Sequence, residues 1–168
     1  MEYKVLRKQY LAKMCFVCGV DNDSGLKTKY YVLENKRVLG IFQGQDIHQS
    51  YPTRMHGGII AALLDEAIGR ALQIDEPEAW AVTIELNVKY HKPVPLNQTL
   101  YVVGWLHSNG KIFDGEGYIM DEDHVILASS KSKYMRQSVQ KIVGNMDFEK
   151  DWQPDSASTD FERIDLPK

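Results

Sequence analysis

The chain has 168 residues, of which 43% are hydrophobic and 26% charged, a composition typical of one globular domain that buries a core without disulfides. Its net charge of −3 gives no reason to expect a nucleic-acid partner, and no apolar run approaches the roughly 18 residues of a membrane span. The N-terminus lacks the basic and apolar regions of a secretory signal, so we expect a cytoplasmic protein without membrane contacts.

The first segment predicts a short amphipathic helix. Residues 3–14 place four large side chains on one helical stripe, namely Tyr3, Leu6, Tyr10 and Met14. Lysine and arginine lie between them, as on the outer face of a helix that packs against the body of a domain.

A single CxxC follows the predicted helix, formed by Cys15 and Cys18. Two thiols supply half of a zinc site, and no second CxxC or HxxxH is present to complete it. Plain structural cysteines, a metal half-site and a redox pair all remain open as interpretations. We predict no metal and no cofactor.

Six strands are expected in the rest of the chain. Residues 26–42 predict a hairpin that turns at residues 34–36, and residues 81–91 alternate apolar and polar side chains more regularly than any other segment. Three further strands are predicted over residues 99–107, 111–120 and 125–135. Because these strands cluster instead of alternating with helices, the fold class is α+β with a mainly antiparallel sheet.

One long helix is predicted between the hairpin and the later strands. Residues 59–68 are apolar except for Asp65 and Glu66, which indicates a helix enclosed by the domain. Glu66 precedes Arg70 by four residues and is expected to form a surface ion pair. Asp65 has no basic residue three or four positions away, and its neighbours on that face are small. A buried carboxylate without a partner is costly, so Asp65 is our candidate catalytic residue.

The beginning of this helix is the second candidate. His56 is followed by Gly57 and Gly58, so the helix would begin with unpaired backbone N–H groups that a carbonyl oxygen can approach closely. That geometry suits an oxyanion hole. A tight turn leading into the helix explains the same residues without any function.

These residues resemble a known family. His56-Gly57-Gly58 followed by Asp65 is similar to the central-helix signature of hotdog-fold acyl-CoA thioesterases, in the 4-hydroxybenzoyl-CoA and phenylacetyl-CoA thioesterase superfamily. The resemblance covers about residues 15–135 and includes the segments 15–19, 48–52, 82–88 and 92–96. It implies a hotdog fold, in which a curved, mainly antiparallel sheet of about six strands wraps around one long central helix.

The resemblance also implies roles for single residues. Gly57 N–H would polarise the thioester carbonyl, and Asp65 would act as general base or as nucleophile. The loop before the helix would help to orient water, through Gln49 or Ser50, although asparagine is the more usual residue there. Thr83 corresponds to a hydroxyl residue that assists the carboxylate in some relatives. His56 would orient water or the thioester, and Gly58 would permit its close approach.

Helix geometry separates the two candidates. His56 and Asp65 are nine residues apart, which is roughly 13 Å along a helix. One carbonyl group cannot touch both, so the two parts of a site must come from different subunits. The family likewise builds its site at a dimer interface. We therefore expect a homodimer or a dimer of dimers that binds an acyl-CoA substrate.

The expected organisation is a single hotdog domain over residues 1–143, with its N-terminal helix, and an acidic tail over 144–168. The tail holds seven acids and three bases and is expected to be loosely ordered or to pack through a few apolar side chains, namely Phe148, Trp152, Phe161, Ile164 and Leu166. The predicted activity is hydrolysis of an acyl thioester. A non-catalytic acyl-thioester binding module and an acyl-CoA hydratase or dehydratase, using His56 and Asp65 across subunits, remain as alternatives.

Overall fold

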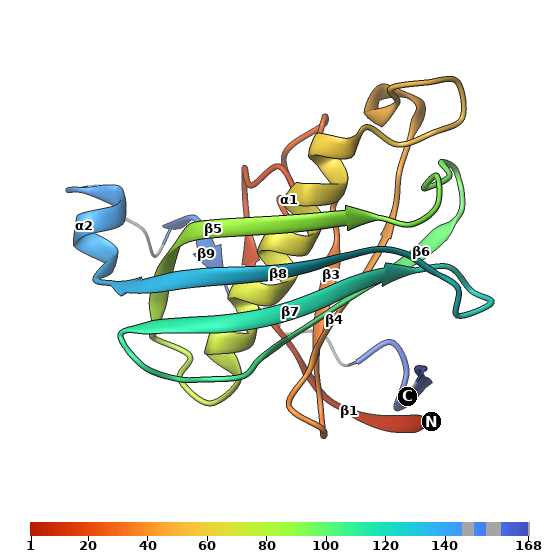
Figure 1. Ribbon diagram of the computed structural model, residues 1–168. Coiled ribbons are helices and arrows are strands. Elements are labelled where there is room, and N and C mark those ends of the chain that lie inside the picture. Colours follow the sequence, from red (N-terminus) through yellow and green to blue (C-terminus); the bar gives the residue numbers. More distant parts are fainter. Residues whose placement is uncertain (146–149, 154–158, 168) are drawn as a thin grey trace.

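The computed structural model describes residues 1–145, 150–153 and 159–167. Within them, one face of an eight-stranded antiparallel sheet carries a single long helix, α1 (Gly57–Gly69), which crosses the strands obliquely (Figure 1). The strand order is β10-β1-β3-β4-β6-β7-β8-β5, so β5 forms one edge. The six predicted strands are β3 (Lys29–Leu33), β4 (Val38–Gln43), β5 (Trp80–Tyr90), β6 (Thr99–Leu106), β7 (Ile112–Met120) and β8 (Ile126–Gln137). A large antiparallel sheet with one long helix confirms the α+β class.

Helix α1 fills the concave side of the sheet because its apolar residues recur at helical spacing. Its buried side chains are Ile60, Leu63, Leu64, Ala67 and Ile68. The first four pack against inward-facing residues of β3, β4, β6, β7 and β8 in one large core, and Ile68 packs with Leu72, Phe113 and Tyr134 in a second cluster. The chain then continues into the 3-10 helix η2 (Arg70–Ile74). The prediction of a helix enclosed by the domain is confirmed.

Three glycines let the helix approach the sheet closely. A Cβ atom at Gly104 would lie 2.5 Å from the Ala67 carbonyl oxygen, and one at Gly117 would lie 2.9 Å from the Ile68 side chain. Gly104 and Gly117 are opposite each other on β6 and β7. Gly115 faces Ile68 in the same way. The absence of side chains at these glycines therefore permits the close helix–sheet contact.

Strand β5 contains a bulge that changes which side chains face α1. Its register with β8 shifts between Thr83 and Glu85, and Ile84 is 49% exposed. Before the bulge, Thr83 points at the helix; after it, Val88 does. Regular alternation along β5 would turn Thr83 away from the face that carries Val88, and the one extra residue at the bulge reverses the pleat and brings Thr83 to the helix side.

The helix predicted over residues 3–14 is also wrong. This segment forms β1 (Glu2–Lys8), which pairs with β3, and the short β2 (Leu11–Ala12). Tyr3 and Val5 also fit a period of two, and Val5 is buried opposite Leu33. Leu6, which a helical stripe would bury, is 54% exposed. Pairing with the edge of the sheet therefore overrides the helical pattern.

Parts of the predicted tail join the fold. Strand β10 (Arg163–Asp165) pairs with β1, so the two ends of the chain lie side by side (Figure 1). Strand β9 (Trp152–Gln153) pairs with β2. Leu166 is fully buried in a cluster on the outer face of the sheet, where Phe161 packs on Tyr31. Phe148 lies outside the described residues.

Two short elements complete the described chain, the 3-10 helix η1 (Asp46–His48) before α1 and helix α2 (Val139–Val143) after β8. None of the helices in the described segments combines the length and the hydropathy that a bilayer span requires.

Candidate active site

The N-terminus of α1 is capped by a side chain from the motif itself. His56 is the N-cap residue, and its Nδ1 accepts a hydrogen bond of 2.9 Å from the Gly58 N–H. Within the described part of the chain, no acceptor lies in hydrogen-bond range of the Gly57 N–H. Tyr90 donates to the Gly57 carbonyl oxygen at 2.9 Å and packs against this glycine. Gly57, and not Gly58, therefore has the N–H group that can bind an incoming oxygen.

The loop that carries Gln49 and Ser50 is fixed to the same end of the helix. Gln49 forms a β-bridge with Met55, and the His56 N–H donates to the carbonyl oxygen of His48. The His48 side chain is buried, with Nδ1 accepting from Gln45 N–H and Nε2 within 2.9 Å of the Ser24 carbonyl. His48 thus holds the loop in place, while Gln49 and Ser50 are exposed beside the helix start.

Asp65 lies half-buried in the middle of α1 and faces β5 and β8. Thr83 on β5 donates a hydrogen bond of 2.8 Å to Asp65 Oδ1. Tyr134 on β8 donates to the same oxygen at 3.1 Å and lies 2.9 Å from the Asp65 backbone carbonyl. No described residue donates to Oδ2. Two hydroxyl groups therefore orient the carboxylate and leave one oxygen for chemistry.

The electrostatic surroundings of Asp65 favour a base. Burial raises the pKa of Asp65 above its ordinary value, the hydrogen bonds from Thr83 and Tyr134 oppose that rise, and the charge of Glu66 adds to it. Burial and the Asp65 charge also raise the pKa of Tyr134, so its hydroxyl remains a donor. A carboxylate that is partly removed from water but not paired with a cation is more basic than a surface aspartate.

A cavity of about 200 Å³ opens beside Asp65. Asp65, Thr83 and Tyr134 lie on its wall, and its other lining residues include the apolar side chains of Leu72, Ala79, Trp80 and Trp152. A ligand could place an apolar group in this cavity and an electrophilic carbon near the carboxylate.

The chain does not bring all predicted site residues together. His56, Gly57, Gly58, Gln49 and Ser50 do not line this cavity. Gly57 and Asp65 are eight residues apart in one helix, about 12 Å along its axis. The single chain thus assembles two half-sites, one at the start of α1 and one around Asp65.

Tyr134 is a site residue that the sequence did not indicate. Thr83 and Tyr134 are direct partners in the β5–β8 register, so both hydroxyl groups flank the helix at one level. That pairing depends on the bulge at Ile84. The alternation within each strand predicts faces, but it does not predict which residues of two strands lie opposite each other.

Glu66 is correctly predicted to pair with Arg70, but the pair does not lie on the surface. Arg70 Nε lies 2.8 Å from Glu66 Oε1, and the Arg70 side chain is only 4% exposed. Its guanidinium lies over the rings of Tyr30 and Trp152, at 4.5 and 4.9 Å from their centres. The pair therefore helps to join α1 to the N-terminal part of the sheet.

Comparison with known proteins shows similarity over slightly less than half of the chain. The family model described as "Thioesterase superfamily" matches residues 53–128, which run from the helix start into β8. The acyl-coenzyme A thioesterase THEM4 of Mus musculus is 35% identical over 83 residues, which are 48% of this chain and 35% of the relative. THEM4 of Bos taurus is 32% identical over 77 residues, 44% of this chain and 30% of the relative. The match thus spans about a third of the length of these curated relatives.

Solved structures share the fold. A crystal structure of a thioesterase superfamily protein has a TM-score of 0.67 and 27% identity, over 73% of this chain and 60% of that chain. The Escherichia coli PaaI protein from the phenylacetic acid degradation operon has a TM-score of 0.61 at 16% identity, over 67% and 81%. A Bacillus halodurans protein solved with CoA has a TM-score of 0.54 at 26% identity, over 59% and 66%. This chain has the hotdog fold, and its residues 53–128 match the model of the thioesterase superfamily.

Proposed function

We propose that the chain hydrolyses an acyl-CoA, or a related acyl thioester, to the free acid and the thiol. The observation that carries this proposal is Asp65, held through one oxygen by Thr83 and Tyr134 at the wall of a cavity that has both polar and apolar lining residues. The match of residues 53–128 to the thioesterase superfamily model, the THEM4 relatives named acyl-coenzyme A thioesterases and the neighbour solved with CoA support the substrate class.

In this reaction the reacting atom of Asp65 is Oδ2, the oxygen that receives no hydrogen bond from the described residues. It either removes a proton from an attacking water molecule or attacks the thioester carbonyl itself to form an anhydride. The Gly57 N–H, at the positive end of the helix dipole, stabilises the oxyanion that develops on the carbonyl. Gln49, Ser50 and His56 lie at the same helix end and orient water or the thioester, and Gly58 leaves room for its approach.

The complete site requires a second subunit, because one thioester cannot span the distance from Gly57 to Asp65. The open edge of β5 supports this arrangement. Its outward-facing Ile84 and its terminal Tyr90 are 49% and 55% exposed, although both are large and largely apolar. We propose that two chains meet along this side, so that Gly57 of each chain faces Asp65 of the other.

Substitution of Asp65 tests the proposal. Asp65→Asn should lower kcat by about 10²- to 10⁴-fold, because the amide neither accepts a proton nor attacks a carbonyl. Release of free thiol should be measured across short-chain, long-chain and aryl acyl-CoA esters. Asp123→Asn, an exposed acid in the turn after β7, is the matched control and should retain full activity.

The outcomes separate the candidate functions. Hydrolysis by the wild type but not by Asp65→Asn, with both proteins dimeric, supports the proposal. Undiminished hydrolysis by Asp65→Asn would remove Asp65 from the mechanism. Tight acyl-CoA binding without thiol release would identify a binding module, and hydration of an enoyl-CoA would identify a hydratase.

A further inference from the structure

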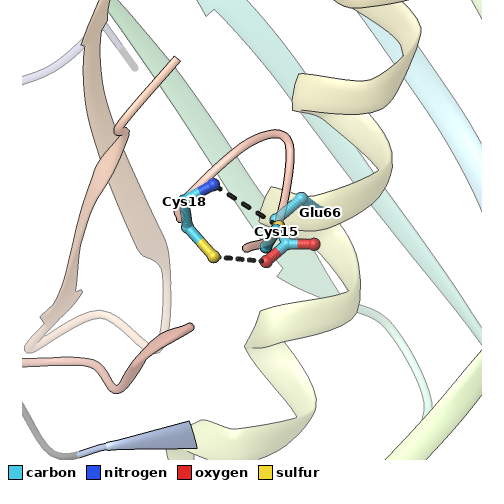
Figure 2. Close-up of side chains that lie close together, drawn as sticks. All are labelled: Cys15, Cys18 and Glu66. Carbon is cyan, nitrogen blue, oxygen red and sulfur yellow. Dashed lines mark hydrogen bonds between the residues drawn. The ribbon is translucent and has the colours of Figure 1, made fainter. Parts of the chain in front are cut away.

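Two cysteines and a glutamate converge on the side of α1 that faces the N-terminal turn. The sulfur atoms of Cys15 and Cys18 and a carboxylate oxygen of Glu66 all lie within 4.8 Å of one another (Figure 2). Cys18 Sγ is 3.5 Å from Glu66 Oε1. Cys18 is fully buried, whereas Cys15 and Glu66 keep partial access to solvent. Glu66 thus adds a carboxylate oxygen to the two sulfur atoms of the single CxxC.

The turn between the cysteines is shaped to present both sulfur atoms. The Cys18 N–H points at Cys15 Sγ from 3.4 Å, an arrangement that stabilises negative charge on sulfur. The Gly19 N–H donates to the Cys15 carbonyl at 2.8 Å and closes the turn. A Cβ atom at Gly19 would lie 2.3 Å from that same carbonyl oxygen, so no other residue fits there without moving the turn.

One distance in the cluster fits the edge of a tetrahedral cation site. With metal–sulfur and metal–oxygen bonds of about 2.3 and 2.1 Å, two ligands of a tetrahedral zinc ion lie about 3.6 Å apart. The 3.5 Å between Cys18 Sγ and Glu66 Oε1 matches this edge. These two ligand atoms could therefore bind one cation with little movement, and Cys15 Sγ lies within 4.8 Å of both.

Charge balance also favours a divalent cation. Arg70 donates through Nε to Glu66 at 2.8 Å and through a terminal nitrogen to Cys18 Sγ at 3.0 Å. Two thiolates, one carboxylate and this guanidinium together carry two negative charges. A divalent ion would neutralise them, and the buried Arg70 would act as an outer partner that orients two of the ligands.

We propose that Cys15, Cys18 and Glu66 bind one thiophilic divalent cation of the zinc class, with water at the fourth position. The ion would join the N-terminal turn to the middle of α1, so its role is structural. The proposal does not depend on thioester hydrolysis, and the two can fail separately.

Cobalt substitution tests the site directly. Full-length protein, reduced and treated with chelator, should bind one Co²⁺ per chain and develop thiolate charge-transfer and tetrahedral d–d absorption bands. Zn²⁺ should displace the Co²⁺ and raise the thermal midpoint, because a ligand that binds only the folded state stabilises it. Metal content of the untreated protein should be measured by elemental analysis.

Variants assign the ligands. Cys15→Ser and Glu66→Gln should each weaken Co²⁺ binding by more than the roughly 10- to 100-fold that outer-partner changes cost. Glu78→Gln, an exposed acid outside the cluster, should bind as the wild type does. Cys18→Ser should weaken Co²⁺ binding in the same way. Because Cys18 is buried, this variant could fail to fold, and Cys15→Ser and Glu66→Gln then decide the question.

Three results would overturn the proposal. The first is absence of thiolate charge-transfer bands from reduced, folded protein at stoichiometric Co²⁺. The second is an unchanged Co²⁺ affinity in Cys15→Ser. The third is a purified protein in which Cys15 and Cys18 have formed a disulfide, with the loss of two hydrogens, and which binds no metal after reduction. That result would make the two cysteines a redox pair.

Discussion

A single carboxylate oxygen receives both hydroxyl hydrogen bonds at the centre of the proposed site. Thr83 and Tyr134 donate to Asp65 Oδ1. This arrangement restrains the carboxylate beside the cavity that Asp65 lines, and Oδ2 receives no hydrogen bond from the described residues. The two hydroxyl groups are therefore positioning groups, and their removal should affect the rate more than substrate binding.

Removal of either hydroxyl group tests this role. Thr83→Val and Tyr134→Phe should each lower kcat about tenfold, equivalent to roughly 1.4 kcal/mol, while changing KM little. Steady-state kinetics with a fixed acyl-CoA would measure the change. Thr99→Val, on the distant strand β6, is the matched control. An effect confined to KM would place Thr83 and Tyr134 in substrate binding instead.

At this scale the sequence singled out Asp65 and Gly57 as candidates because both are exceptions to their surroundings. An acid in an apolar helix and a glycine pair at a helix start are visible without coordinates. Tyr134 was not visible, because its role depends on the register between β5 and β8. The position of Glu66 beside Cys15 and Cys18 was not predicted, because the spacing of residues in the sequence does not show that these cysteines fold back onto the helix.

At the scale of elements, the fold depends on close contact between α1 and the glycines of β6 and β7. Gly104→Ala should destabilise the protein by about 3 kcal/mol, because its Cβ atom would overlap the backbone of α1. Gly69→Ala, where the nearest atom is 3.4 Å away, should leave stability unchanged or raised. Denaturant unfolding of both variants would measure the difference. Equal stability of Gly104→Ala and the wild type would show that the helix can move away from the sheet.

An ion pair joins the loop after η2 to the end of β8. Arg136 makes two hydrogen bonds to the Glu76 carboxylate, at 2.7 and 2.8 Å, and Asn109 donates to it as well. These hydrogen bonds lower the pKa of Glu76 to about 2. The folded state thus holds the ionised form more strongly than the unfolded chain does.

This shift predicts a pH dependence. Because the folded pKa is lowered, the stabilisation is present above the ordinary pKa of glutamate and is lost as the pH falls towards about 2. Glu76→Gln should therefore lower the thermal midpoint at about pH 7, and its difference from the wild type should shrink by about pH 3. Glu78→Gln is the exposed neighbouring control. A difference that stays constant with pH would contradict the role of the charge.

The strands between α1 and residue 137 were predicted well, and the first strand was not. Strands β5 to β8 have long alternating patterns and clear turns, so local sequence determines them. For β1, the residues Tyr3 and Val5 satisfy a helical stripe and a strand equally. The contact with β3, distant in the sequence, decides between the two, and no local pattern contains that information.

At the scale of the whole molecule, the proposed site is formed by two subunits. If Gly57 and Asp65 act across an interface, two inactive variants should complement each other. Gly57→Val and Asp65→Asn should each be inactive as homodimers, whereas a mixed dimer contains one intact site and should regain part of the activity. Co-expression with two different affinity tags would isolate the mixed dimer. An inactive mixed dimer would argue for a site within one chain.

The pairing of β1 with β10 has a mechanical consequence. Glu2 lies opposite Asp165 and Lys4 opposite Arg163, so the two chain ends leave the sheet at the same point. A force that pulls these ends apart would load the hydrogen bonds one after another, as in opening a zipper, and not all together. Strand β10 would peel away at low force and uncover Tyr31 on the outer face, while α1 and the carboxylate it holds would remain in place.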